Sequence, residues 1–122
     1  MILVDANIVL RYILWDNIEF ANKAKEILEN EQIILPFEVI AEIVYVLNKV
    51  YDVPRKNIHQ FILHIINYPN ILTNNKKVLE KGLEFYTSSN FDFIDSILLG
   101  YNHEEGYKIY SFDKKINKFM RK

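Results

Sequence analysis

The sequence contains no cysteine, which excludes disulfides, thiolate zinc sites and cysteine nucleophiles from this chain. Absence of disulfides is typical of a reducing compartment, so we expect a cytoplasmic protein. Only 3 glycines and 3 prolines are present, and no Gly-, Pro- or Ser-rich stretch divides the chain as a linker would. Because 50% of the residues are hydrophobic and 25% are charged, we expect one folded domain over residues 1–122.

Long hydrophobic runs are also missing from the sequence. No apolar run approaches the roughly 18 residues that a membrane-spanning helix requires. The N-terminus has no basic segment before its first aliphatic residues, and Asp5 lies where a signal peptide would be apolar. We therefore expect no membrane association.

Neither sign of charge predominates, since 16 acidic and 15 basic residues give a net charge of −1. This balance argues against a globally basic nucleic-acid-binding protein. Basic residues nevertheless gather near the C-terminus, at Lys114, Lys115, Lys118, Arg121 and Lys122. This cluster is either a solvated tail or a patch that contacts a polyanion.

Short aliphatic segments alternate with longer segments of helical periodicity along the whole chain. Strands are expected at residues 2–4, 33–35, 71–72 and 108–112, the first of them buried. Helices are expected at residues 7–14, 17–30, 36–50, 58–66, 78–85, 94–101 and 114–120. This alternation predicts an α/β fold, a single-domain α/β/α sandwich with a central parallel sheet.

Acidic residues lie where the expected strands end or where helices begin. Asp5 follows the first strand and Asp113 follows the last, whereas Glu42 lies early in the helix after the second strand. Asp92 and Asp95, three residues apart, share one face at the start of a later helix. Ligands of α/β folds bind beyond the carboxyl ends of the strands, so these acids are candidate site residues.

Each acid also has a structural explanation that involves no ligand. Asp5 and Asp113 are suited to cap the helices that follow them. Asp92 and Asp95 resemble a capping box in which Asp replaces Glu. Glu42 lies at the edge of an apolar helical stripe, and is either partly buried with a partner or on the surface.

Taken together, Asp5, Glu42, Asp95 and Asp113 predict a cation site. If they converge with separations of about 6 Å, each pair repels by ~3 kcal/mol at an effective dielectric constant of ~20. Six such pairs reach roughly 15 kcal/mol, which is comparable with the stability of a whole domain. Such a site must bind protons or a hard divalent cation, and oxygen ligands favour Mg²⁺ or Mn²⁺. With basic side chains nearby, it is suited to metal-assisted phosphodiester hydrolysis.

Four segments resemble, in order and spacing, the motifs of PIN-domain ribonucleases; they are LVDANIVLRY, LPFEVIAEIVYVL, FDFIDSILLG and IYSFDKKINK. The likeness is greatest to the VapC-type toxins of bacterial and archaeal toxin–antitoxin pairs, and it runs from Ile2 to about Lys118. The resemblance implies a parallel sheet flanked by helices and RNA cleavage that depends on Mg²⁺ or Mn²⁺. It also implies a homodimer and a small antitoxin protein whose tail enters the site.

The resemblance assigns roles residue by residue. The acids predicted to hold one or two metal ions are Asp5, Glu42, Asp95 and Asp113. Asn7 matches a polar position two residues after the first acid, and Ser111 stands where a T-x-D-like motif has Thr; both are expected to support the site by hydrogen bonding. Ser96 stands where Ala is usual and Ala6 where Thr is frequent, and neither departure removes a carboxylate.

Other residues have less specific roles. Asp92 is either a fifth site acid or only a helix cap. Arg11, Lys114 and Lys115 are candidate contacts to RNA phosphates. The hypothesis is an endoribonuclease in which a metal ion activates water and offsets charge on the phosphate, while one carboxylate orients or deprotonates the water.

Three alternative functions remain open from the sequence. A phosphatase with Asp5 as nucleophile is disfavoured because Asn7 takes the place of the second acid of a D-x-D motif. A nucleic-acid-binding or protein-interaction module with a degenerate acidic site is the second alternative. The third is a structural domain in which all the acids are helix caps.

Overall fold

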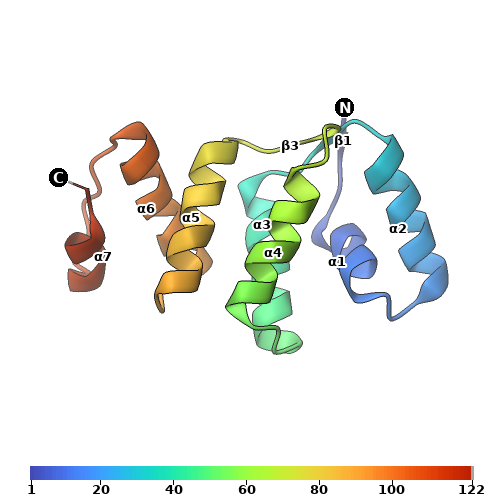
Figure 1. Cartoon of the computed structure of the whole chain (residues 1–122), viewed down its shortest axis with the longest axis horizontal. Helices are drawn as coiled ribbons and strands as arrows, with labels where there is room; N and C mark the ends of the chain where they lie inside the picture. Colours follow the sequence, from blue (N-terminus) through green and yellow to red (C-terminus); the bar gives the residue numbers. More distant parts are fainter. Residues whose placement is uncertain (122) are drawn as a thin grey trace. The chain divides into compact units, whose positions relative to one another are not determined.

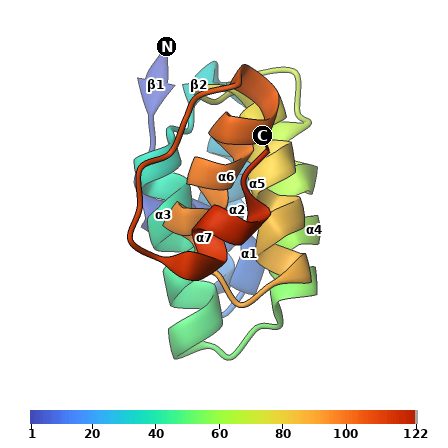
Figure 2. The same cartoon turned by 90° about the vertical axis from the view of Figure 1, so that its left-hand side faces the viewer.

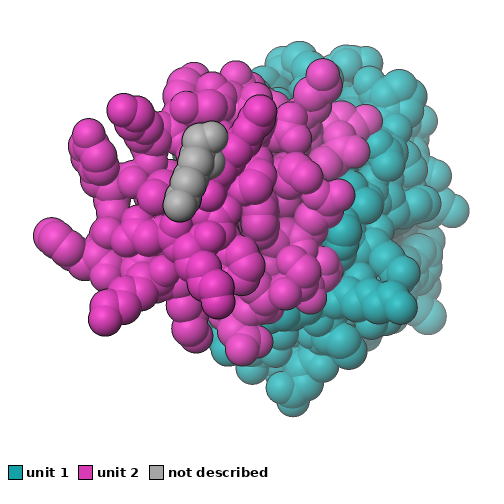
Figure 3. Space-filling view, turned by 60° about the vertical axis from the view of Figure 1, so that its left-hand side comes forward, with its two compact units in different colours: residues 1–74 teal, residues 75–122 magenta. Residues whose placement is uncertain are grey.

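The computed structural model describes residues 1–121, and the chain divides into two compact units, residues 1–74 and residues 75–122 (Figure 3). The first unit contains a parallel sheet with the strand order β1-β2-β3, of which Figure 1 labels β1 and β3. Its strands are β1 (Ile2–Leu3), β2 (Ile33–Ile34) and β3 (Ile71–Leu72). Ile33 of the middle strand is in register with Ile2 on one side and with Ile71 on the other.

Helices connect these strands, as parallel pairing requires. The helical elements of the first unit are α1 (Ala6–Leu14), α2 (Ile18–Asn30), α3 (Phe37–Tyr45), the π-helical turn η1 (Val46–Val50) and α4 (Arg55–Ile66). Their aliphatic faces and the sheet form a core whose fully buried members include Leu28, Ile33, Leu35, Ile40, Ile43, Leu47, Ile58 and Ile62. Burial of this apolar surface is the main stabilising contribution to the unit.

The second unit consists of α5 (Lys76–Ser88), α6 (Phe93–Glu105) and α7 (Lys114–Phe119). Two glycines allow α5 and α6 to approach closely: a Cβ atom on Gly100 would lie 2.6 Å from the carbonyl oxygen of Val78 and 3.1 Å from the nitrogen of Gly82. A cluster of Phe91, Leu99 and Ile116 then attaches α7 to this helix pair.

The predicted α/β fold with a parallel sheet flanked by helices is confirmed. Every helix expected from the periodicity is present, although η1 takes the place of the last turn of the helix expected at residues 36–50. Within residues 1–121, no helix is both long enough and apolar enough to cross a bilayer. The expectation of a single domain over residues 1–122 stays a prediction.

Two expectations about strands are wrong. Residues 108–112 form no strand; they belong to an irregular segment that runs from α6 to α7 (Figure 2). Their side chains favour a strand, but no partner strand pairs with them among the described residues. The side-chain amides of Asn102 and Asn117 instead donate to the carbonyl oxygens of Tyr107 and Ser111. The first strand is not buried either, because β1 is an edge strand in which Ile2 is 39% and Leu3 70% exposed.

Candidate functional site

The five candidate acids divide between the two units. Asp5 and Glu42 belong to the first unit, whereas Asp92, Asp95 and Asp113 belong to the second. Each group is therefore described within its own unit. The local chain geometry explains the position of every one of these side chains.

Asp5 is the N-cap residue of α1. Its backbone is extended, with φ −84° and ψ 172°, and its Oδ1 accepts a hydrogen bond from the N–H of Ile8 at 3.2 Å. Capping satisfies a donor that the first helical turn leaves free. The side chain is exposed at the end of β1, so the apolar N-terminal segment carries no buried charge. Asn7 is exposed in the first turn of the same helix.

Glu42 lies on the exposed side of α3, whose buried side is formed by Ile40, Ile43 and Val44. The expectation that Glu42 lies on the surface is therefore correct, and the expectation of a partly buried position is not. Helices α1 and α3 contact each other, so Asp5 and Glu42 are carried by elements that pack together within the first unit.

Asp92 and Asp113 cap the two helices that hold the second group of acids. Oδ1 of Asp92 accepts the N–H of Asp95 at 2.8 Å at the start of α6, and Oδ1 of Asp113 accepts the N–H of Lys115 at 2.8 Å at the start of α7. The N–H of Asp113 in turn donates to Oγ of Ser111 at 3.0 Å. The expectation that Ser111 supports an acid is consistent with this hydrogen bond.

Asp95 is partly buried between these two caps. Burial, and then the negative charges of Asp92 and Asp113, raise the pKa of the Asp95 carboxyl. The tertiary fold thus brings Asp113 close enough to Asp95 for its charge to act on that carboxyl. The capping roles of Asp92 and Asp113 are confirmed, and they leave the second carboxylate oxygen of each side chain outside the capping bond.

No group of three or more His, Asp or Glu side chains is arranged to hold a metal ion within residues 1–121. Oxygen donors of the kind that a hard divalent cation prefers are nevertheless present in the second unit, where the charges of Asp92 and Asp113 act on Asp95. Burial is the main cause of the raised pKa of Asp95, and a cation bound there would offset the smaller contribution of Asp92 and Asp113.

Two buried polar residues of the second unit have structural roles that the sequence analysis did not predict. Ser96 is fully buried, and its Oγ donates to the carbonyl oxygen of Asp92 at 2.8 Å, which fixes the first turn of α6. Asn102 is also buried, and its amide contacts both the residues after α6 and those after α7. The sequence signal for both is a polar side chain at a helix position otherwise surrounded by apolar residues.

The candidate phosphate contacts differ in their surroundings. Nη1 of Arg11 donates to both carboxylate oxygens of Asp16 at 2.8 Å, and a hydrogen bond with Tyr51 raises the pKa of the guanidinium. A phosphate would have to compete with Asp16 for this side chain. Lys114 and Lys115 are exposed on the first turn of α7, and neither forms an ion pair within the described part of the chain.

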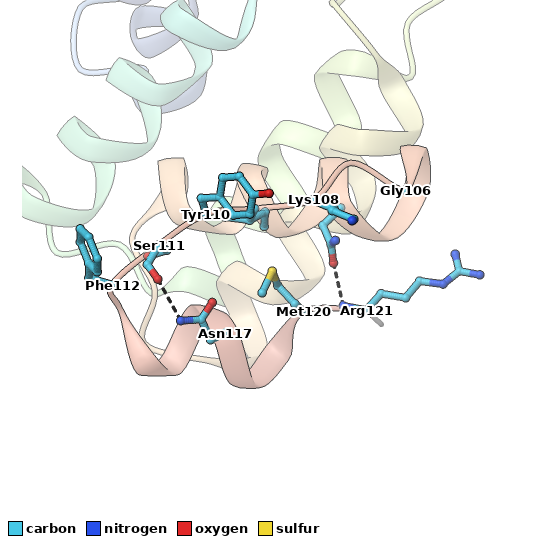
Figure 4. A pocket seen from close by; sticks show the side chains of 10 residues that line it. Gly106, Lys108, Tyr110, Ser111, Phe112, Asn117, Met120 and Arg121 are labelled. Carbon is cyan, nitrogen blue, oxygen red and sulfur yellow. Dashed lines mark hydrogen bonds between the residues drawn. The ribbon is translucent and has the colours of Figure 1, made fainter.

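A cavity of about 810 Å³ adjoins Ser111 in the second unit (Figure 4). It lies between the segment that follows α6 and the residues of α7 and the C-terminal end. Its lining includes Lys108, Tyr110, Ser111, Phe112, Asn117 and Arg121. This volume lies within the range of about 300–1,000 Å³ typical of ligand sites.

Comparison with known proteins gives one result. The sequence matches the family model of the PIN domain over residues 2–122, which covers both units. No curated protein and no solved structure matches the chain significantly.

Proposed function

The chain belongs to the PIN domain family, whose members are generally nucleases, and from this premise we propose that it is a metal-dependent endoribonuclease. The observation that carries the proposal is the family match over residues 2–122, and the negative charges of Asp92 and Asp113 that act on Asp95 support it. Neighbouring carboxylates provide the oxygen ligands that a hard divalent cation at a phosphodiester prefers.

The proposed ligands of Mg²⁺ or Mn²⁺ are Asp5, Glu42, Asp95 and Asp113. A bound ion would lower the pKa of a water molecule and offset charge that develops on the phosphate oxygens. Asp5 and Glu42 belong to the first unit, and Asp95 and Asp113 belong to the second. Asn7 and Ser111 orient the acids beside them, and the hydrogen bond from the Asp113 N–H to Ser111 supports the second of these roles.

One of these carboxylates orients or deprotonates the attacking water. Asp92 caps α6 and contributes charge beside Asp95, so we assign it an electrostatic and positioning role.

We extend the proposal to a toxin that acts as a homodimer and is neutralised by a cognate antitoxin protein. The support for this extension is the order and spacing of the four motifs, which are similar to those of VapC-type toxins. A short neighbouring reading frame that encodes a DNA-binding protein would distinguish a toxin from a general nuclease.

The decisive experiment compares cleavage of single-stranded RNA in Mg²⁺, in Mn²⁺ and in chelator. Asp95→Asn should remain folded, as judged by circular dichroism, and should lose metal-dependent cleavage. Glu80→Gln, which changes an exposed acid on α5, is the matched control and should cleave like the wild type. Full activity of the Asp95→Asn protein contradicts the assignment.

The alternative functions give different results in the same assay. Metal-independent RNA binding without cleavage favours a non-catalytic module. A phosphoryl group trapped on Asp5 favours the phosphatase. Asp→Asn substitutions that lower stability but leave cleavage intact favour helix capping as the only role of these acids.

A further inference from the structure

The segment between α6 and α7 is anchored at both ends and irregular between them. It begins after Gly106, which ends α6 with a φ of 73°, and Tyr107 is held through its carbonyl oxygen by Nδ2 of Asn102 at 2.7 Å. At the other end, the carbonyl oxygen of Ser111 accepts a hydrogen bond from Nδ2 of Asn117 at 2.9 Å. The segment therefore has defined ends and presents residues 107–112 on the surface of the second unit.

Its large aromatic side chains face solvent. Tyr110 is 96% exposed and Phe112 is fully exposed, whereas Ile109, which lies before Tyr110, packs against the Phe91–Leu99–Ile116 cluster. Figure 4 shows both rings extending from the segment. The ring of Tyr107, also exposed, stacks on Tyr101 with 6.1 Å between the centroids. Neighbouring exposed rings on one segment commonly mark a binding surface.

The sequence that contains these rings is strongly basic. Residues 107–122 contain six basic residues and one acidic residue, Asp113. Lys108 and Arg121 line the cavity behind the segment, and Lys114 and Lys115 lie exposed directly after it. Aromatic rings interleaved with cations are the combination that binds single-stranded nucleic acids, through base stacking and phosphate contacts.

We propose that residues 107–115 and Arg121 form a binding track for single-stranded RNA, in which bases stack on Tyr110 and Phe112 while Lys108, Lys114, Lys115 and Arg121 contact phosphates. This inference rests on the proposed function and names the element that recognises its substrate. The track includes Asp113, so a bound strand passes beside one of the acids of the second unit. The cavity of about 810 Å³ behind Ser111 is large enough to accept an unstacked base.

The positive charge of this segment favours RNA over a second copy of the chain as the bound partner. A second copy of this chain carries 16 acidic and 15 basic residues, so its overall charge gives little attraction to this basic segment. A polyanion compensates all six basic residues of the segment, and each phosphate that a basic side chain neutralises releases a counterion.

The test measures binding of the full-length protein to a fluorescein-labelled oligouridylate of about 12 nucleotides, in chelator so that no metal-dependent cleavage occurs. Tyr110→Ala and Phe112→Ala should each raise the dissociation constant about tenfold, because each removes one stacking platform. Both side chains are exposed, so the variants should fold normally. Phe20→Ala, an exposed phenylalanine on α2, is the aromatic control and should bind like the wild type.

A second comparison isolates the charges. Lys114→Ala/Lys115→Ala should reduce the slope of log affinity against log salt by about 0.7 for each phosphate that is no longer neutralised. Lys76→Ala/Lys77→Ala removes two exposed lysines from the equivalent first turn of α5 and should leave the slope unchanged.

The outcomes separate this inference from the proposed function. Unchanged affinity of the two aromatic variants, with cleavage still abolished by Asp95→Asn, overturns the track and leaves the nuclease intact. Aromatic-dependent binding by a protein that never cleaves RNA supports the track and contradicts the nuclease. If Tyr110→Ala converts a dimer into a monomer in sedimentation without affecting RNA affinity, the segment is a protein interface and the inference is wrong.

Discussion

Nδ2 of Asn102 donates a hydrogen bond to the carbonyl oxygen of Tyr107 at 2.7 Å, from a side chain that is almost completely buried. The Oδ1 of the same amide accepts the N–H of Arg121 at 2.7 Å. One buried side chain of α6 therefore holds both the segment before α7 and the residues after it. The buried amide of Asn102 therefore helps to hold in place the segment that carries Tyr110 and Phe112.

Asn102→Ala should destabilise the protein by about 2–3 kcal/mol, because it leaves the Tyr107 carbonyl and the Arg121 N–H without a partner. Urea denaturation measures this decrease in stability. Hydrogen exchange should also become faster at the amides of residues 107–112 than in α5. Asn90→Ala, an exposed asparagine, serves as the control and should change stability by less than about 0.5 kcal/mol. Equal effects of the two variants would show that the Asn102 bonds contribute little.

Asp95→Asn should stabilise the protein at pH 7. The folded protein raises the pKa of Asp95, so ionisation of this carboxyl costs folding free energy, and stability falls as the pH rises from the ordinary value of 3.8 through the folded value. The asparagine variant lacks this cost. Its melting temperature should therefore exceed that of the wild type at pH 7, and the difference should shrink towards zero near pH 3.

The Asp95→Asn substitution also tests which charges contribute to the raised pKa of Asp95. Asp113→Asn removes one of the two charges that act on Asp95, so the stabilisation gained from Asp95→Asn should be smaller in the Asp113→Asn background. A stabilisation that is independent of pH would point to packing and not to charge.

Substitutions of Asp5 separate helix capping from catalysis. Asp5→Ala should cost about 1 kcal/mol of stability, since the N–H of Ile8 loses its acceptor. Asp5→Asn keeps a capping oxygen and should be nearly as stable as the wild type. If Asp5 is a metal ligand, both variants lose RNA cleavage, and thermal melts combined with cleavage assays distinguish the roles. Cleavage by Asp5→Asn at the wild-type rate would limit Asp5 to capping.

Gly100→Ala should destabilise the second unit by about 1–3 kcal/mol. The new Cβ would lie 2.6 Å from the carbonyl oxygen of Val78, and backbone atoms can relieve that clash only if α5 and α6 separate. Lys77→Ala on the exposed side of α5 is the control. A melting temperature equal to that of the wild type would show that the helix pair tolerates a wider spacing.

Local patterns predict most elements of this fold. Apolar spacing identifies the helix-forming segments, since it depends only on the helical period. Asp5, Asp92 and Asp113 are recognisable as cap residues because capping joins atoms a few residues apart. The strand prediction at residues 108–112 is wrong because strand formation does not depend on local sequence alone. Its β-branched and aromatic residues favour a strand, but a strand exists only where a partner strand supplies hydrogen bonds.

The sequence by itself determined which segments form helices, which faces are apolar and which acids stand at the ends of elements, because these properties are set by neighbours along the chain. Only the tertiary structure decided that the charge of Asp113 acts on Asp95, and that Asn102 binds both the Tyr107 carbonyl and the Arg121 N–H. It also decided that the rings of Tyr110 and Phe112 face solvent. Contacts between residues distant in sequence depend on how helices pack, and that packing reflects the summed burial of many side chains, which no short motif encodes.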